Sequence, residues 1–379
     1  MNIDKKTDIL ITCSRGIAPF LEREIRGLGF PVVSSHATGV ITTGSLRDTY
    51  RLNLELRTAF NVLFLLKAFR CVSPAELYNK VYQIQWDDII PKDEYISVVS
   101  RVSNPKIKNS MFASQKLKDA LVDRMLKLTG SRPNSGPDRN GMVLNLYWKD
   151  DRAWLYINTS GTKLSDRGYR KIPLQAPMQE TLAAAVLMAS GYDGSSDLVN
   201  PMCGSGTLAI EAALIALGKA PGLLRSNFGF MHIKGHDDPY WRGLRKDTLE
   251  RSERKISHKI IATDIREEAV KAASKNAMTG GVDHLIEFGS CDFRETPVPE
   301  SEGIVLLNPE YGERMGKIKE LEKTYSGIGD FFKQKCTGFT GHIFTGNLDL
   351  AKKVGLRTDE RIPFYNGSIE CRLLKYDIY

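Results

Sequence analysis

Two short loops, each following an apolar run, constrain the possible fold and function of this chain more than any other feature. Residues 200–207 read Asn-Pro-Met-Cys-Gly-Ser-Gly-Thr and lie between apolar runs at 197–199 and 208–217. Residues 308–311 read Asn-Pro-Glu-Tyr and follow the apolar run 304–307. A strand, a tight glycine turn and a helix N-terminus let the backbone approach a nucleoside-bearing cofactor. The amide, carbonyl and aromatic ring of the second loop suit a flat ring that carries an exocyclic amine.

Neither loop is decisive alone. The first has no Gly-Lys-Ser/Thr of a Walker loop and only two of the three glycines of Gly-x-Gly-x-x-Gly, so a plain tight turn is the alternative. Two more apolar runs, 259–263 and 285–288, lead to Asp264 and Asp292. Asp264 suits ribose hydroxyls or a helix N-cap, and Asp292 suits an adenine amine or a turn. Ligands of open α/β sheets bind at strand carboxyl ends, so this order of loops predicts one cofactor site.

Hydrophobic periodicity predicts the elements around these loops. Further strands are expected at 8–13, 39–44, 95–101, 142–148, 153–158, 342–345 and 368–376. Helices are expected at 19–28, 46–54, 114–127 and 321–335, besides those that follow the first two cofactor strands.

The chain resembles class I S-adenosylmethionine-dependent methyltransferases, and more narrowly the bacterial RNA methyltransferases that carry a THUMP domain and methylate guanine N2. Besides Asp264, the resemblance rests on residues 158–170, 176–183, 200–212, 220–222, 308–314 and 365–373, and it covers nearly the whole chain. It implies an α/β fold whose Rossmann-like class I methyltransferase domain follows a THUMP RNA-binding domain and a small ferredoxin-like α/β unit. The corresponding expected bounds are 161–379, 66–160 and 1–65.

The resemblance also implies roles for individual residues. Asn308 and the Pro309 carbonyl would accept hydrogen bonds from the target amine, and Tyr311 would stack on the flipped base. The residues expected to bind the cofactor S-adenosylmethionine are Thr181, Asn200, Pro201, Cys203, Gly204, Ser205, Gly206, Asp264, Ile265, Asp292, Phe293 and Asn308.

Two residues depart from the family pattern. The family commonly has Asp where this chain has Asn200, so a negative charge facing the ammonium group of methionine is lost. It usually has Pro where this chain has Glu310, so a backbone restraint is lost and a charge is gained beside the reaction centre. We expect the Glu310 side chain to lie in solvent; contact with the acceptor base is the alternative.

Positive charge is concentrated in one part of the chain. The net charge is +8, and between Arg101 and Ile172 fifteen Lys and Arg stand against six Asp and Glu. Such clustering is typical of phosphate binding, with a solvated helix face as the alternative. Residues 219–259 mix aromatic and basic side chains, which suits either single-stranded RNA or a packing insert. The residues expected to contact RNA are Lys116, Lys118, Arg124, Arg167, Arg170 and Tyr311.

Composition and cysteine spacing limit the cellular location and the metal chemistry that we expect for this protein. The chain has no apolar run long enough to span a membrane, its N-terminus lacks a signal-peptide core, and its six cysteines show no paired spacing. These features predict a cytoplasmic protein without a metal site, and they leave the oligomeric state open.

The sequence therefore predicts an RNA guanine-N2 methyltransferase acting on large-subunit (23S) ribosomal RNA. A tRNA substrate is the nearest alternative, and DNA adenine-N6 methylation could use the same Asn-Pro-x-Tyr chemistry. An RNA-binding protein with a degenerate methyltransferase fold also stays open because of Asn200 and Glu310. A hydride-transferring dehydrogenase is disfavoured by both loops.

Overall fold

The computed structural model describes residues 3–104, 107, 109–174, 177–311 and 318–378. Of the stretches quoted above, Ala176 and residues 312–314 lie outside the described residues. The chain forms two compact units. The first comprises Met1–Cys13, Leu21–Asp166 and Arg225–Asp247, and the second comprises Ser14–Phe20, Arg167–Leu224 and Thr248–Tyr379.

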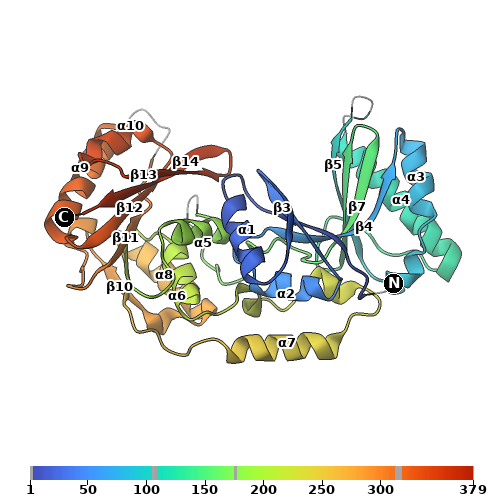
Figure 1. Cartoon of the computed structure of the whole chain (residues 1–379), viewed down its shortest axis with the longest axis horizontal. Helices are drawn as coiled ribbons and strands as arrows, with labels where there is room; N and C mark the ends of the chain where they lie inside the picture. The colour runs from blue at the N-terminus through green and yellow to red at the C-terminus, as the bar shows by residue number, and fades with distance from the viewer. Residues whose placement is uncertain (1–2, 105–106, 108, 175–176, 312–317, 379) are drawn as a thin grey trace. The chain divides into compact units, whose positions relative to one another are not determined.

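The first unit is built on one sheet with the strand order β2-β3-β1-β4-β7-β6-β5. Figure 1 labels β3, β4, β5 and β7 of this sheet. Neighbouring strands pair antiparallel except β5 and β6, which are parallel. Helices α3 and α4 pack against each other, and α4 also packs on β5. The strands are β1 Thr7–Thr12, β2 Val32–His36, β3 Gly39–Gly44, β4 Asn61–Arg70, β5 Ile96–Ser103, β6 Met142–Lys149 and β7 Arg152–Asn158. The helices are α1 Ala18–Gly27, α2 Asp48–Glu55, α3 Pro74–Tyr82 and α4 Ser110–Thr129; α1 crosses the division between the units.

Strand β4 joins the two halves of this sheet. Its first residues pair with β1, as in Ile9 with Phe64, and its pairing with β7 runs as far as Arg70 with Arg152. Strand β4 pairs with β1 at its start and with β7 along the rest of its length, and the two pairings overlap at Leu63 and Phe64. Its residues 62–66 form an apolar run without alternation. The boundary expected between residues 65 and 66 therefore falls inside one strand.

The aromatic residues of the 219–259 stretch form a core. Phe228 and Phe230 are fully buried and stack with ring centroids 5.2 Å apart. The Phe230 ring also stacks on Tyr50 at 4.1 Å, and Trp241 of α7 (Asp238–Glu250) meets Phe230 edge-on at 4.9 Å. Packing therefore accounts for these rings, which removes them from the RNA-binding alternative; Tyr240 stays 40% exposed.

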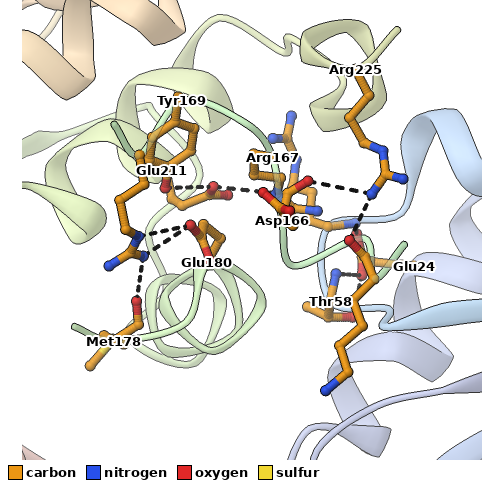
Figure 2. A network of polar contacts seen from close by, with 12 residues as sticks. Glu24, Thr58, Asp166, Arg167, Tyr169, Met178, Glu180, Glu211 and Arg225 are labelled. Atoms are coloured by element: carbon orange, nitrogen blue, oxygen red, sulfur yellow. Dashed lines mark hydrogen bonds and ion pairs between the residues drawn. The ribbon is translucent and has the colours of Figure 1, made fainter. Parts of the chain in front are cut away.

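Arg225, in the same stretch, has a structural role. Arg225 is 8% exposed, and its guanidinium donates to the carbonyls of Ser160, Thr162 and Lys163 and to the Thr162 hydroxyl. Figure 2 shows its further bond to the Asp166 carbonyl. A buried guanidinium loses its hydrogen bonds to water, and these carbonyl acceptors replace them.

The second unit is an open, mostly parallel sheet with the order β10-β9-β8-β11-β12-β14-β13. Strands β8 to β12 are mutually parallel, and β14 is antiparallel to β12 and β13. The strands are β8 Asp197–Pro201, β9 Ile260–Asp264, β10 Ile286–Ser290, β11 Gly303–Leu307, β12 Phe339–Thr345, β13 Glu360–Asn366 and β14 Ile369–Asp377. The helices are α5 Glu180–Ala189, α6 Thr207–Ala216, α8 Glu267–Gly280, α9 Ile318–Lys335 and α10 Leu348–Ala351.

Both faces of this sheet are covered. Val199, Val305 and Leu307 turn one face towards α9, where they join a buried cluster with Tyr325 and Phe332. Helices α6 and α8 pack on β8, β9 and β10, and α5 packs on α6. The order of the strands reverses between β8 and β11, so the loops after them flank a topological switch point, where ligands of such sheets bind.

Candidate active site

The glycine loop after β8 has the conformation that its residues suggest. Gly204 and Gly206 have φ values of 56° and 84°, in the left-handed region that favours glycine. A Cβ on Gly206 would lie 2.8 Å from the Cβ of Ala273, so α8 can approach the loop only because residue 206 is glycine. Helix α6 begins at Thr207 without a side-chain cap, and its first amides form the positive end of a helix dipole.

A cavity of about 1010 Å³ lies at the carboxyl ends of the strands of the second unit. It brings together ten of the expected site residues, namely Cys203, Gly204, Ser205, Asp264, Ile265, Asp292, Phe293, Asn308, Pro309 and Tyr311. The cavity lining does not include Thr181, Asn200, Pro201 and Gly206, of which Thr181 and Asn200 are fully buried.

Asp264 holds the glycine loop as well as facing the cavity. One carboxylate oxygen accepts from the Gly204 amide at 3.0 Å, and the other accepts from the Arg266 amide at 3.0 Å. The next residue, Ile265, leaves 69% of its side chain exposed on the cavity wall. A hydrogen-bonding carboxylate beside an exposed apolar side chain suits a ribose with an attached flat base.

Asp292 is already bound to a cation. Its carboxylate accepts two bonds from the Arg294 guanidinium, at 2.8 and 2.7 Å, and one from the Arg294 amide at 3.0 Å. The hydrogen bond from the Arg294 side chain is the main reason why the pKa of Asp292 is lowered. Asp292 is therefore a fixed acceptor on the same wall as Ile265 and Phe293.

Asn308, Pro309 and Tyr311 present different groups to the cavity. The Asn308 Oδ1 atom is buried and has no hydrogen-bond partner in the described part of the chain. Burial raises the pKa of Tyr311 to about 12, so its phenol is neutral at physiological pH. The Glu310 side chain is exposed at the cavity wall.

Three buried oxygens in this region are unsatisfied within the described residues: Thr181 Oγ1, Asn200 Oδ1 and Asn308 Oδ1. Asn200 uses its amide nitrogen to bind the Leu306 carbonyl at 2.7 Å, which leaves only the oxygen free. Buried polar atoms in folded proteins nearly always have partners, so unpaired ones near a cavity indicate ligand groups that donate hydrogen bonds. Asn308, on the cavity wall, thus fits a ligand with an amine group, whereas Asn200, at the end of β8, does not line the cavity.

Arg167, which the sequence predicts to contact RNA, is buried in this structure. Its side chain is 1% exposed and pairs with Glu211 at 3.4 Å, and Tyr169 donates to the same carboxylate at 3.1 Å (Figure 2). Arg170 is likewise held by Glu180 at 3.0 Å and by the Met178 carbonyl at 2.7 Å. These cations fix the segment before α5 rather than facing solvent.

Three of the expected RNA contacts lie on α4. Lys116 lies over the Phe112 ring, and Lys118 pairs with Asp119 at 3.0 Å. Arg124 lies over Tyr82 and donates to Gln85.

Several residues of this region were not expected from the sequence. Glu211, the acid that Arg167 and Tyr169 bind, is the one charged residue in the apolar helix α6, and that isolation is the signal that could have indicated a buried partner. The cavity wall also includes Met178, Met202, Asn366 and Ile369. The last two come from the turn between β13 and β14, far along the chain from either loop.

No helix in the described ranges is long and apolar enough to cross a bilayer. The same residues contain no group of three His, Cys, Asp or Glu side chains that could hold a metal ion.

Comparison with known proteins identifies three regions. Residues 167–375 match the RMKL-like methyltransferase domain, residues 8–63 match the RlmL ferredoxin-like domain, and residues 72–158 match the THUMP domain. The ribosomal RNA large subunit methyltransferase K/L of Syntrophotalea carbinolica is 36% identical over 386 residues, which cover 99% of this chain and 54% of that protein. The chain thus spans about half the length of the K/L relatives it matches.

Two further relatives match over their full length. The candidate RNA methyltransferase slr0064 of Synechocystis is 31% identical over 368 residues, which cover 97% of this chain and 96% of that protein. The crystal structure of SMU.472, a candidate methyltransferase complexed with SAH, superimposes with a TM-score of 0.88 at 26% identity, covering 99% of each chain. The chain belongs to the family of RMKL-like methyltransferase domains, here combined with a THUMP domain and an RlmL ferredoxin-like domain.

Proposed function

We propose that the chain transfers a methyl group from S-adenosylmethionine to the exocyclic N2 amine of a guanine in large-subunit ribosomal RNA. The names of the K/L relatives and the THUMP match support RNA as the substrate. The observation that carries the proposal is Asn308 Oδ1, a buried acceptor without a partner among the described residues. Asn308 lines the same cavity as the glycine loop and Tyr311.

The loops after β8, β9 and β10 would hold the cofactor. Asn200 and Thr181 offer acceptor oxygens for an ammonium group, Asp264 for ribose hydroxyls, and Asp292 for the adenine amine. SAH in the SMU.472 crystal structure supports a cofactor of this type. When bound, S-adenosylmethionine supplies a methyl group that its sulfonium already activates, so the protein need only align and dehydrate the acceptor.

The loop after β11 would prepare the acceptor amine. The lone pair of a guanine amine is conjugated with the ring, so the nitrogen is flat and weakly nucleophilic. Oxygens of Asn308 and Pro309 accept the two amine hydrogens and favour a tetrahedral nitrogen, and these bonds strengthen as positive charge develops there. The ring of Tyr311 would stack on the extruded base, and water would take the proton that leaves afterwards.

The same proposal extends to the rest of the chain. We propose a ferredoxin-like unit at 1–65, a THUMP RNA-binding domain at 66–160 and the methyltransferase domain at 161–379. The α4 residues Lys116, Lys118 and Arg124 would contact RNA phosphates.

Two measurements test the function. Calorimetry should show S-adenosylmethionine binding to the full chain, and absence of binding would favour a degenerate, RNA-binding protein. Ribosomal RNA and tRNA from a strain lacking the gene should then be incubated with the protein and digested to nucleosides for mass spectrometry. N2-methylguanosine in the ribosomal RNA digest supports the proposal; methyl groups only in tRNA or only on adenine N6 would contradict it.

Asn308→Ala tests the acceptor role. We expect a fall in kcat of about 10²–10³-fold, because one of the two acceptors for the developing cation is lost. The dissociation constant for S-adenosylmethionine should change less than about threefold if Asn308 acts chiefly on the acceptor. Asn308→Asp keeps an acceptor at this position and should retain more activity than the alanine variant. Full activity in Asn308→Ala would contradict the assignment.

A further inference from the structure

The topology of the second unit places three separate segments beside Tyr311. Strand β12 pairs with β11 in parallel, so the loops that follow both strands start at the same sheet edge. Strand β14 runs antiparallel to β12, with Thr345 opposite Arg372, so the start of β14 lies at that edge too. The turn between β13 and β14 supplies Asn366 and Ile369 to the cavity that Tyr311 lines.

The Tyr311 hydroxyl is anchored by this turn. Asn366 donates from its amide nitrogen to the hydroxyl oxygen at 3.0 Å, and the buried Cys371 sulfur lies 3.9 Å from the same oxygen. The hydrogen bond from Asn366 stabilises the phenolate and opposes the effect of burial, yet the pKa of Tyr311 stays at about 12. The phenol therefore stays protonated, and its part is to hold a geometry rather than to take a proton.

The Tyr311 ring rests on the backbone of Gly346. A Cβ built on Gly346 would lie 3.0 Å from Cδ2 and 3.1 Å from Cε2 of Tyr311, and 2.9 Å from Cγ2 of Ile369. The φ of Gly346 lies outside the left-handed region, so close approach, and not backbone conformation, is what requires glycine here.

The backbone on both sides of Gly346 is itself fixed. Thr345 shares a hydrogen bond of 2.7 Å with Tyr325 of α9 and accepts another from the Asn347 amide at 3.1 Å. Asn347 caps α10 by accepting from the amides of Asp349 and Leu350. The surface under the ring therefore cannot shift without breaking these bonds.

We propose that Asn366 and Gly346 form a seat that fixes the plane of the Tyr311 ring and thereby sets the position of the acceptor base. This inference rests on the proposed function, because it assigns to Tyr311 the face on which the base stacks. Asn366 and Gly346 are positioning residues: they act on the base through Tyr311. A ring held by its hydroxyl at one end and by backbone along one side presents its opposite face in one orientation, which alignment of an amine with a methyl group requires.

A double-mutant cycle on the full chain tests the hydroxyl anchor. Asn366→Ala and Tyr311→Phe should each lower kcat/KM for RNA by about 5- to 20-fold through misplacement of the ring, with S-adenosylmethionine affinity changed less than about twofold. The double variant should be no worse than Tyr311→Phe alone, because both changes remove the same bond. Multiplied effects, or a loss of cofactor affinity in Asn366→Ala, would overturn the anchor.

Gly346→Ala tests the contact under the ring. The added methyl should displace Tyr311 and lower kcat for RNA more than Asn366→Ala does. Gly280→Ala is the matched control, since a Cβ there would meet its nearest neighbours at 3.6 Å, an ordinary contact. The control should keep wild-type activity, and unchanged activity in Gly346→Ala would refute the seat.

Crystal structures of the ligand-free variants separate this inference from the proposed function. A Tyr311 ring that keeps its wild-type orientation in both Asn366→Ala and Gly346→Ala refutes the seat, whatever the protein methylates. A displaced ring in these variants, with no methyl transfer by the wild-type chain, keeps the seat as a structural unit and refutes the proposed function.

Discussion

At the residue scale, some contacts of the site can be predicted from the sequence and others cannot. The loops around Gly204 and Asn308 have distinctive residues directly after strands, so it was predictable that both would line one cavity. The burial of Arg167 is harder to predict, because its partner Glu211 lies 44 residues away and the local signal is only that Glu211 is the one charged residue in apolar α6. Asn366 reaches Tyr311 across 55 residues, which only the sheet order explains.

Glu310 gives a prediction at this scale. Its carboxylate is exposed at the cavity wall, where we expect it mainly to repel RNA phosphates. Glu310→Gln should therefore tighten RNA binding about two- to fivefold at low salt and leave kcat within about twofold. Filter binding at several salt concentrations and single-turnover assays measure the two effects.

Glu302→Gln is the control for that experiment, because Glu302 is exposed but does not line the cavity. It should leave RNA affinity nearly unchanged. A large fall in kcat for Glu310→Gln at unchanged RNA affinity would mean that the carboxylate contacts the base instead.

At the scale of elements, strand positions could be predicted from the sequence where an apolar run ends in turn residues. The expected strand 39–44 coincides with β3, whereas β4 was not expected, because its continuous apolar run Val-Leu-Phe-Leu-Leu lacks the alternation that indicates a strand. Helix α4 begins at Ser110, four residues before the expected start, because the Asn109 side chain caps it by accepting from the amides of Met111 and Phe112.

Strand β12 carries a titratable group that makes stability depend on pH. His342 is 1% exposed, and burial, assisted by the nearby charge of Lys375, lowers its pKa from 6.5 to about 4. Between these values the unfolded chain binds the proton and the folded chain does not, so stability falls as pH falls. The contribution lost across this window is on the order of 3 kcal/mol.

Urea unfolding at a series of pH values should show this loss. His342→Leu should flatten the dependence of the unfolding free energy on pH in the window between 6.5 and 4. His284→Leu, at an exposed position, should leave it unchanged. Equal slopes for the wild-type chain and His342→Leu would show that other groups dominate.

At the scale of the whole molecule, the uneven charge is the main clue to the partner. The chain carries a net charge of +8, while the stretch from Arg101 to Ile172 carries fifteen Lys and Arg against six Asp and Glu. Part of this charge is held in ion pairs within the protein, since Arg167 is buried against Glu211 and the partly buried Arg170 pairs with Glu180. The cations left for RNA phosphates in this stretch include Lys116 and Lys118 on α4.

The double variant Lys116→Glu, Lys118→Glu should weaken RNA binding uniformly across sequences. The slope of log affinity against log salt should fall by about two, because each of the two lysines would no longer neutralise a phosphate. Lys271→Glu on α8 is the control, with a charge reversal outside α4. An unchanged slope in the double variant would remove α4 from the RNA-binding surface.

The shared strand β4 has a consequence for how this chain could be divided. A cut after Leu65 would keep every β4 partner of β1, from Asn61 to Phe64, in the first piece, but it would divide the partners of β7 between the two pieces. One part of β7 would then have open backbone groups in either piece. The ferredoxin-like and THUMP portions should therefore be inherited together. Recombination could transfer both to another protein, but a junction between residues 65 and 66 would divide the sheet that they share.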